Sequence, residues 1–421
     1  MEKKKFEYKW VIVAISFLMV FTCLGFCSSN KSLYLGAITE ALNIPRSAFS
    51  INDTFRYVAS ALINFFFGTL VAKFGIRKMV SFGFVCLIVS VLCYAYAEVM
   101  WVFYIGGALL GIGLAFTTTA MATILVKRWF TGNTGTVLGV VLAANGLGGA
   151  LAAQIVDPII SKHAFGYRDA YTMVAIILAV VGTLTVVFLR EKPKGHEGEL
   201  IVKNKKKVRG SGWVGMEFKD ALKLRYFIPA CAGIFFTGMV LSGVNGIGGA
   251  HLKDVGLTDF AKTVLSVHSL VLLFAKTLAG IIYDKKGLRF MLSLCMITGA
   301  VATTLLSFTG NTPMGMIFAM AWGILSSFAL PMETIGVSLV TADLYGNKAF
   351  DKLLGIMLAL NHLGYAVGSV VMNFFFDLCG GTYFYVMLAF GGIMLLVTLG
   401  YQFIITAAHK ERKRIEALEA A

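Results

Sequence analysis

The sequence predicts an all-α membrane protein with twelve transmembrane helices arranged in two similar six-helix halves. Three observations lead to this fold class: the composition, a series of long apolar runs and an internal repeat. Of the 421 residues, 58% are hydrophobic and 14% are charged, whereas a soluble domain is about 45–50% apolar and about 25% charged. This composition excludes a soluble enzyme, a secreted disulfide scaffold and a disordered chain, and it favours a chain with many membrane spans.

A membrane-crossing helix needs about 20 mostly apolar residues, and runs of this kind recur along the whole chain. Charged residues interrupt two of them, the second at Asp53 and Arg56 and the eighth at Lys276. The run Phe290–Met332 is too long for one span, and the turn signal Asn311-Thr312-Pro313 divides it in two. The predicted spans are, in order, Trp10–Asn30, Ser47–Ala72, Met79–Ala97, Val99–Val126, Trp129–Val156, Ala170–Leu189, Tyr226–Ala250, Thr263–Tyr283, the two parts of Phe290–Met332, Leu353–Phe376 and Leu378–Ala408.

The distribution of basic residues predicts how these spans are oriented. With the N-terminus placed in the cytoplasm, 29 Lys and Arg residues fall in cytoplasmic segments and 6 fall in outer loops. Because cytoplasmic loops of membrane proteins are enriched in Lys and Arg, we expect a multi-pass protein of the cell membrane with both termini in the cytoplasm. Contact of these loops with the lipid bilayer also accounts for the formal net charge of +15, so no nucleic-acid partner is expected.

Several motifs are missing from the sequence, and their absence narrows the function. Six of the seven cysteines lie in apolar runs and no CxxC pair occurs, so we expect neither a disulfide framework nor a metal or redox site. No GxxxxGK[ST] loop and no HExxH motif occur, so ATP is not expected to supply the energy and an enzyme is not expected. We also expect no cofactor and no cleavable signal peptide.

The chain repeats itself at about half its length. The segment Gly68–Arg77 recurs as Gly280–Arg289, at an offset of 212 residues, and Leu142–Ala150 recurs as Leu358–Ala366. Two similar halves in parallel repeat are the architecture of many secondary transporters, which bind substrate between the halves near the midplane of the bilayer. The predicted domains are an N-terminal six-helix half at 1–190, a basic cytoplasmic linker at 191–223 and a C-terminal six-helix half at 224–421.

The repeated loop carries a family resemblance. The segment Gly280-Ile-Ile-Tyr-Asp284-Lys-Lys-Gly287 resembles the loop signature G-x-x-x-D-R/K-x-G of the major facilitator superfamily. In the first copy Ala72 stands at the acidic position, so the charge cluster there is expected to be built differently. The resemblance covers nearly the whole chain and implies the major facilitator fold, alternating access, and gating or coupling roles for Asp284 and Arg77.

Within that superfamily the chain is most similar to the branch of oxalate–formate antiporters and monocarboxylate porters, through Asn43–Ser47, Lys127–Phe130 and Asp220–Lys223. That branch commonly carries an arginine four residues before the glycine of the signature, where this chain has Lys276. The oxalate antiporter also has a lysine in helix 11, where this chain reads Asn361-His362. This chain therefore has one permanent cation at these two positions, where the oxalate antiporter has two. The resemblance thus implies a monocarboxylate rather than a dicarboxylate as substrate.

Ionisable residues within the predicted spans are candidate site residues because they are costly to place in a bilayer. Lys276 lies near mid-membrane, where it either binds an anion or forms a structural ion pair with Glu333. Glu333 is also a candidate coupling or inner-gate group. His362, whose ordinary pKa is near 6.5, either carries a coupled proton and contacts substrate, or is a neutral core histidine hydrogen-bonded across helices.

Arg56 and His268 occupy equivalent positions in the two halves, in the outer third of the membrane. Arg56 either attracts anions and contacts substrate or pairs with Asp53, one helical turn away. His268 is the corresponding candidate for gating.

Amide and phenol groups complete the set of candidates. Asn145 and Asn361 are equivalent in the repeat, and each binds either substrate or a neighbouring helix. Tyr34 either hydrogen-bonds a substrate carboxylate or is an aromatic anchor at the membrane interface.

These observations predict a monomeric secondary active transporter that moves a small organic anion by proton symport or anion exchange. The alternative is a proton-coupled antiporter of multiple drugs or other organic solutes, in which Glu333 would matter more than Lys276.

Overall fold

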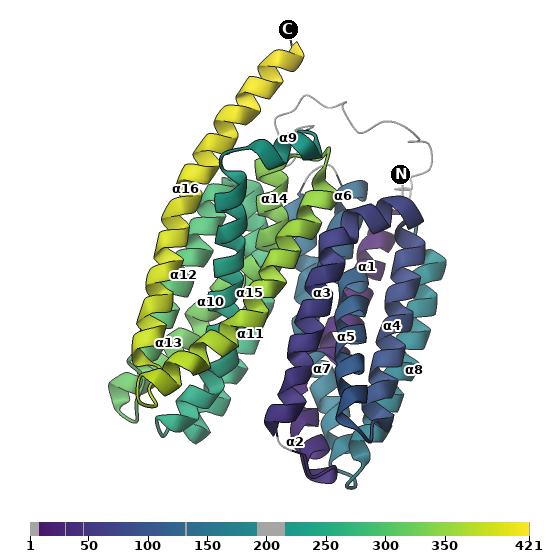
Figure 1. Cartoon of the computed structure of the whole chain (residues 1–421), viewed down its shortest axis with the longest axis vertical. Coiled ribbons are helices and arrows are strands. Elements are labelled where there is room, and N and C mark those ends of the chain that lie inside the picture. The colour runs from purple at the N-terminus through teal and green to yellow at the C-terminus, as the bar shows by residue number, and fades with distance from the viewer. Residues whose placement is uncertain (1–7, 30, 45, 131–132, 192–214, 421) are drawn as a thin grey trace, which may run out of the picture. The chain divides into compact units, whose positions relative to one another are not determined.

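The computed structural model describes residues 8–29, 31–44, 46–130, 133–191 and 215–420, and every regular element in this part of the chain is helical (Figure 1). Within these residues, twelve helical segments are long and apolar enough to cross a membrane, which confirms the predicted all-α fold. The chain divides into two units, Met1–Lys207 and Val208–Ala421. Most of the predicted linker, residues 192–214, lies outside the described residues.

Unit 1 contains six spans and one short additional helix, α2, that the apolar pattern did not predict. Its fourth span consists of two helices, α5 and α6. The helices are α1 (Lys9–Cys27), α2 (Lys31–Ala41), α3 (Arg46–Phe74), α4 (Ile76–Tyr96), α5 (Met100–Thr117), α6 (Thr119–Trp129), α7 (Thr134–Ile160) and α8 (Gly166–Phe188).

Unit 2 contains the other six spans, preceded by the short helix α9. Its last helix, α16, extends beyond the other helices of this unit (Figure 1). The elements are α9 (Phe218–Lys223), α10 (Phe227–Asp254), α11 (Thr258–Lys286), α12 (Leu288–Ser307), α13 (Pro313–Ala329), the π-helical turn η1 (Met332–Gly336), α14 (Val337–Tyr345), α15 (Phe350–Leu378) and α16 (Phe384–Ala420).

The same pairs of spans pack against each other in both units. Helix α1 packs on α7 as α10 packs on α15, α3 on α5 as α11 on α13, and α4 on α8 as α12 on α16. The closest approaches also correspond: a Cβ atom at Gly148 would overlap the Phe21 carbonyl, and one at Gly364 would overlap the Phe235 carbonyl. Small residues that let helix backbones touch are typical of membrane helix packing.

Two glycines of the repeated loop have the same backbone conformation. Gly75, between α3 and α4, has φ 83°, and Gly287, between α11 and α12, has φ 85°. L-residues rarely adopt positive φ, so glycine is the residue that allows these abrupt turns between consecutive spans. The sequence repeat therefore reflects a repeated backbone geometry.

Two spans differ from their prediction. The fourth is interrupted at Thr118, where the hydroxyls of Thr117 and Thr118 bind the carbonyls of Gly113 and Leu114 at 2.9 and 2.6 Å; such bonds bend helices. The tenth was expected to end at Met332, but the helix continues through η1 and α14.

Candidate functional site

Lys276 lies on α11 and is 4% exposed, with buried Ala275 and Ala279 beside it in the chain. In the part of the chain that the structure describes, its ammonium has neither a hydrogen bond nor an ion pair within 4.0 Å. Glu333 is the carboxylate whose charge acts on it from a greater distance. Since no ion pair within 4.0 Å joins the two groups in the described residues, the alternative of a direct structural pair with Glu333 is not realised in this structure. A cation within a membrane span that has no contacting partner is energetically unfavourable.

Glu333 lies in η1, the π-helical turn that follows Pro331. Single π-helical turns occur frequently at functional sites because they change the direction in which side chains project. This turn packs against α10, α11 and α12. The Tyr365 hydroxyl donates a hydrogen bond to the Glu333 backbone carbonyl at 3.2 Å. Tyr365 thereby joins α15 to the turn that carries the acid.

One face of α15 brings further polar groups to Tyr365. The ring of His362 contacts the Tyr365 ring edge to face, with centroids 5.4 Å apart. Asn361, one turn before Tyr365, is 1% exposed, and neither its amide oxygen nor its amide nitrogen has a hydrogen-bond partner in the structure. Because buried polar groups are almost always hydrogen-bonded, an amide in this state indicates a place for a ligand or water.

His268 lies on α11, eight residues before Lys276, and belongs to a different cluster. Its Nδ1 lies 3.0 Å from the Gly323 carbonyl and the Ser326 and Ser327 hydroxyls. Its ring stacks on Trp322 with an interplanar angle of 7°. The carbonyl contact requires a proton on Nδ1, so α13 fixes the orientation of this ring. The structure does not bring His268 to the Lys276 ammonium.

Arg56 and Asn145 both bind the end of α1 in unit 1. The Arg56 guanidinium donates to the Ser28 hydroxyl at 2.7 Å and lies 3.8 Å from the Asp53 carboxylate. The predicted pairing of Arg56 with Asp53 is therefore present in the structure. The Ser29 hydroxyl donates to the Asn145 side-chain oxygen at 2.8 Å. Sequence reasoning missed both serines, although adjacent serines at the end of an apolar run are a visible signal.

Tyr34 lies on α2 and is 2% exposed. Its ring stacks on Tyr171, with centroids 4.0 Å apart, and its hydroxyl is buried without a hydrogen-bond partner. Burial within unit 1 does not fit an anchor at the membrane interface.

The two repeated loops obtain their carboxylate from different positions in the chain. Asp284 occupies the last turn of α11. In unit 1, where Ala72 replaces the acidic residue, Glu191 provides a carboxylate instead: it accepts a hydrogen bond from the backbone N–H of Arg77 at 3.2 Å. A carboxylate there also complements the positive end of the α4 dipole. Glu191 follows α8 in the chain, so motif matching within the loop could not find it.

No group of three or more His, Cys, Asp and Glu side chains among the described residues could hold a metal ion. The candidate groups of unit 2 are Lys276 on α11, Glu333 on the π-helical turn, and the amide, phenol and imidazole groups on α15.

Comparisons with known proteins agree with this fold. The chain is 24% identical to the uncharacterized MFS-type transporter YcxA of Bacillus subtilis (strain 168), over 89% of this chain and 90% of the relative. It is 23% identical to Multidrug resistance protein 2 of the same organism, over 83% and 82%. The structure of the E. coli fucose:proton symporter superposes with a TM-score of 0.70 at 15% identity, covering 94% of this chain and 99% of the symporter.

A family model gives the assignment. Residues 11–260 and 230–420 match the model of the Major Facilitator Superfamily, which covers nearly the whole chain. The members of this superfamily and the solved structures that resemble this chain are transporters, not enzymes. The chain therefore belongs to the Major Facilitator Superfamily, a family of membrane transporters.

Proposed function

We propose that this protein is a secondary active transporter that moves a small organic monoanion across the cell membrane, with Lys276 as the main anion ligand. One observation carries the proposal: Lys276 is 4% exposed, and its ammonium has no ion pair within 4.0 Å in the described residues. A carboxylate that enters beside it would replace the lost hydration with a charge-assisted hydrogen bond. The binding site and its charge are then complementary to a carboxylate.

The charge balance around Lys276 favours a monoanion over a dianion. Glu333 is near enough for its charge to act on Lys276, so the field of the single cation is already partly offset. The Asn361 amide supplies hydrogen-bonding capacity without a second charge. These features fit the monocarboxylate substrates of the branch that the sequence resembles.

Neutralisation of Lys276 supplies the link between binding and movement. An empty site would close around an unpaired cation in a dry cavity, which is unfavourable; a bound anion removes that cost, so the loaded site closes more readily. Because the basic residues are concentrated in segments assigned to the cytoplasm, we place both termini there. His362 and Glu333 are the groups we propose for proton coupling, and exchange against a second anion is the other mode.

The second candidate function is proton-coupled antiport of drugs or other organic solutes. The similarity to Multidrug resistance protein 2 favours it, as does the position of Glu333 on a π-helical turn with Tyr365 as its partner. In that case a cationic or neutral solute would exchange with a proton on Glu333, and Glu333→Gln rather than Lys276→Gln would abolish transport.

Uptake into proteoliposomes distinguishes the two functions. We would supply labelled monocarboxylates and a lipophilic cation to wild type, Lys276→Gln and Glu333→Gln, with and without a pH gradient. The matched control is Lys286→Gln, which removes the same charge from an exposed position on α11. Our proposal expects carboxylate uptake that Lys276→Gln abolishes and Lys286→Gln retains. Uptake of the cation alone, abolished by Glu333→Gln, would contradict it.

A further inference from the structure

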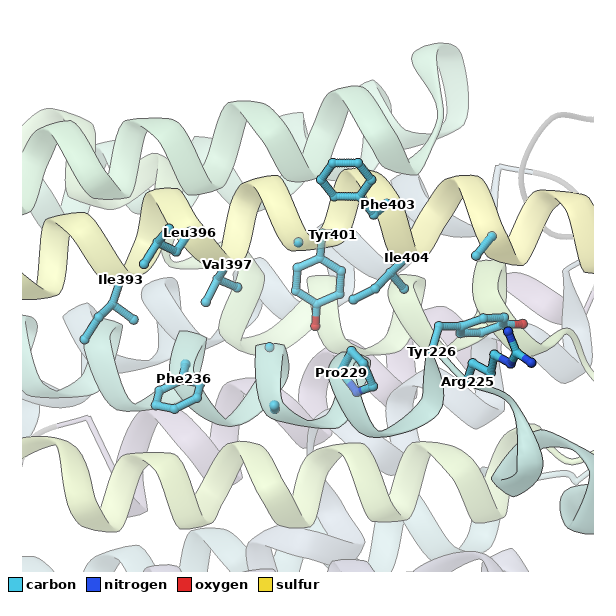
Figure 2. Close-up of a pocket in the computed structure, with 14 residues that line it drawn as sticks. Arg225, Tyr226, Pro229, Phe236, Ile393, Leu396, Val397, Tyr401, Phe403 and Ile404 are labelled. Carbon is cyan, nitrogen blue, oxygen red and sulfur yellow. The ribbon is translucent and has the colours of Figure 1, made fainter.

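A groove with a volume of about 650 Å³ runs along unit 2 between α10 and α16 (Figure 2). Its walls are almost entirely apolar, with Phe236, Ile393 and Leu396 toward one end. Helix α16 supplies Gly400, where an added Cβ atom would meet nothing within 4 Å, so the lack of a side chain there leaves the groove open. At Gly233 of α10 the Tyr401 ring occupies the corresponding space. The polar tip of Tyr401 is already satisfied, because its hydroxyl donates to the Ala230 carbonyl at 3.1 Å.

The groove lies within membrane-spanning helices. Both Phe227–Asp254 and Phe384–Ala417 are long and apolar enough to cross a membrane. Lining side chains face outward from the unit, since Leu396 is 69% exposed and Phe403 is 77% exposed. From Ile393 to Ala407 the groove extends about 21 Å at 1.5 Å per residue. One leaflet of a bilayer's hydrocarbon core is about 15 Å thick, so the groove spans the depth of a lipid acyl chain.

One end of the groove is basic. Arg225 and Tyr226 lie together at this end, away from Phe236 (Figure 2). Lys410 follows the last lining residue of α16, Ala407, by three positions. The neighbouring acid Glu411 lies 3.6 Å from Arg414, so its charge is offset. An apolar groove that ends at cationic side chains matches a molecule with a hydrocarbon chain and an anionic head.

We propose that this groove binds an acyl chain of an anionic phospholipid, whose phosphate contacts Arg225. Basic pockets between transmembrane helices are a known form of lipid headgroup recognition. The phospholipid stabilises the contact of α10 with α16 by filling the space beside Gly400. The proposal concerns the lipid-facing side of unit 2 and does not depend on the transported substrate.

The test is native mass spectrometry of the full chain in detergent, titrated with phosphatidylglycerol or with phosphatidylcholine of the same acyl chains. Arg225→Gln removes the headgroup contact, and Lys286→Gln is its charge-matched control. Gly400→Leu fills the groove, and Gly392→Leu is its control on the same helix. A Cβ atom at either glycine meets no atom within 4 Å, so both leucine variants are expected to fold.

We expect wild type, Lys286→Gln and Gly392→Leu to retain phosphatidylglycerol in preference to phosphatidylcholine. Loss of one basic group near an anionic lipid weakens binding about fivefold, which is the change expected for Arg225→Gln, and Gly400→Leu should lose the bound lipid. Equal binding by Gly400→Leu and Gly392→Leu would overturn the groove assignment. Equal binding of the two lipids would overturn the headgroup assignment, and a lipid-free dimer that Gly400→Leu dissociates would identify a second copy of the chain as the occupant.

Discussion

The contact between α1 and α7 is so close that a single added methyl group should disturb it. A Cβ atom at Gly25 would lie 2.5 Å from the carbonyl carbon of Gly148 and 2.6 Å from its Cα. Both are backbone atoms, so no side-chain rotation can relieve the overlap. Ordinary contact begins at 3.4 Å, and Gly25→Ala therefore requires the two helices to separate by roughly 0.9 Å, the difference between these contact distances.

Three terms determine the expected effect of Gly25→Ala on stability. Overpacking costs about 1–3 kcal/mol, and the better helix propensity of alanine offsets about 1 kcal/mol of that. The Ser29–Asn145 hydrogen bond, now 2.8 Å, would lengthen beyond hydrogen-bonding distance if the helices part along it, at a further cost of about 0.5–1.5 kcal/mol. The sum is a net destabilisation of about 0.5–3.5 kcal/mol.

The assay is the midpoint of thermal unfolding of the purified protein in detergent, with Gly392→Ala as the control. Gly392 is also helical, but a Cβ atom there meets nothing within 4 Å, so this variant gains helix propensity without a clash. We expect Gly25→Ala to unfold several degrees below wild type and Gly392→Ala to unfold at or above it. Equal midpoints for the two variants would show that α1 and α7 separate without cost and would refute the reasoning.

Three further predictions concern the acid, the histidine and the loop carboxylate. Tyr365→Phe leaves the Glu333 carbonyl without its hydroxyl donor and should lower stability by about 1–2 kcal/mol, measured as a lower thermal midpoint; an unchanged midpoint would mean that the bond contributes nothing. His362→Gln should preserve anion exchange and abolish accumulation driven by a pH gradient, whereas unchanged accumulation between about pH 5 and 8 would make His362 a packing residue. Glu191→Gln keeps an acceptor for the Arg77 N–H but removes the negative charge, so it should cost about 0.3–1 kcal/mol at low salt and nothing at high salt; a cost independent of salt would exclude the electrostatic explanation.

The features that sequence could predict are those that depend on local pattern. Apolar runs located the twelve spans because every helix in a bilayer must present apolar side chains over its length. The break before Pro313 was visible because proline has no N–H to continue a helix; α12 ends at Ser307 and α13 starts at Pro313. The repeat also predicted correctly that Gly75 and Gly287 are equivalent.

The features that sequence did not predict depend on contacts between distant segments. The sequence around Glu333 does not predict that the hydroxyl of Tyr365, on another helix, donates a hydrogen bond to its backbone carbonyl. Glu191 replaces the missing acid of the first loop from a position outside the motif. Intramembrane charge did identify Lys276, because an ionisable residue in a span is costly wherever it lies, but whether Glu333 contacts it could only be measured in the structure.

The central claim is that Lys276 binds the transported anion and is not a structural partner of Glu333. The direct measurement is calorimetric binding of the monocarboxylate that proteoliposome uptake identifies, with purified wild type, Lys276→Gln, Glu333→Gln and the double variant. Truncating one partner of a buried charge pair costs at least about 2 kcal/mol, so Lys276→Gln should weaken binding by about thirtyfold or more. Lys276→Arg should retain part of the affinity, since the charge remains while the geometry changes.

The double variant decides between the two accounts. If Lys276 is the ligand, Lys276→Gln/Glu333→Gln binds as weakly as Lys276→Gln alone, because removing Glu333 does not restore a cation. If Lys276 only compensates Glu333, the single variant fails because the half-buried Glu333 carboxylate is left uncompensated, and the double variant recovers binding. We predict no recovery; a double variant that binds the carboxylate like wild type would contradict the account.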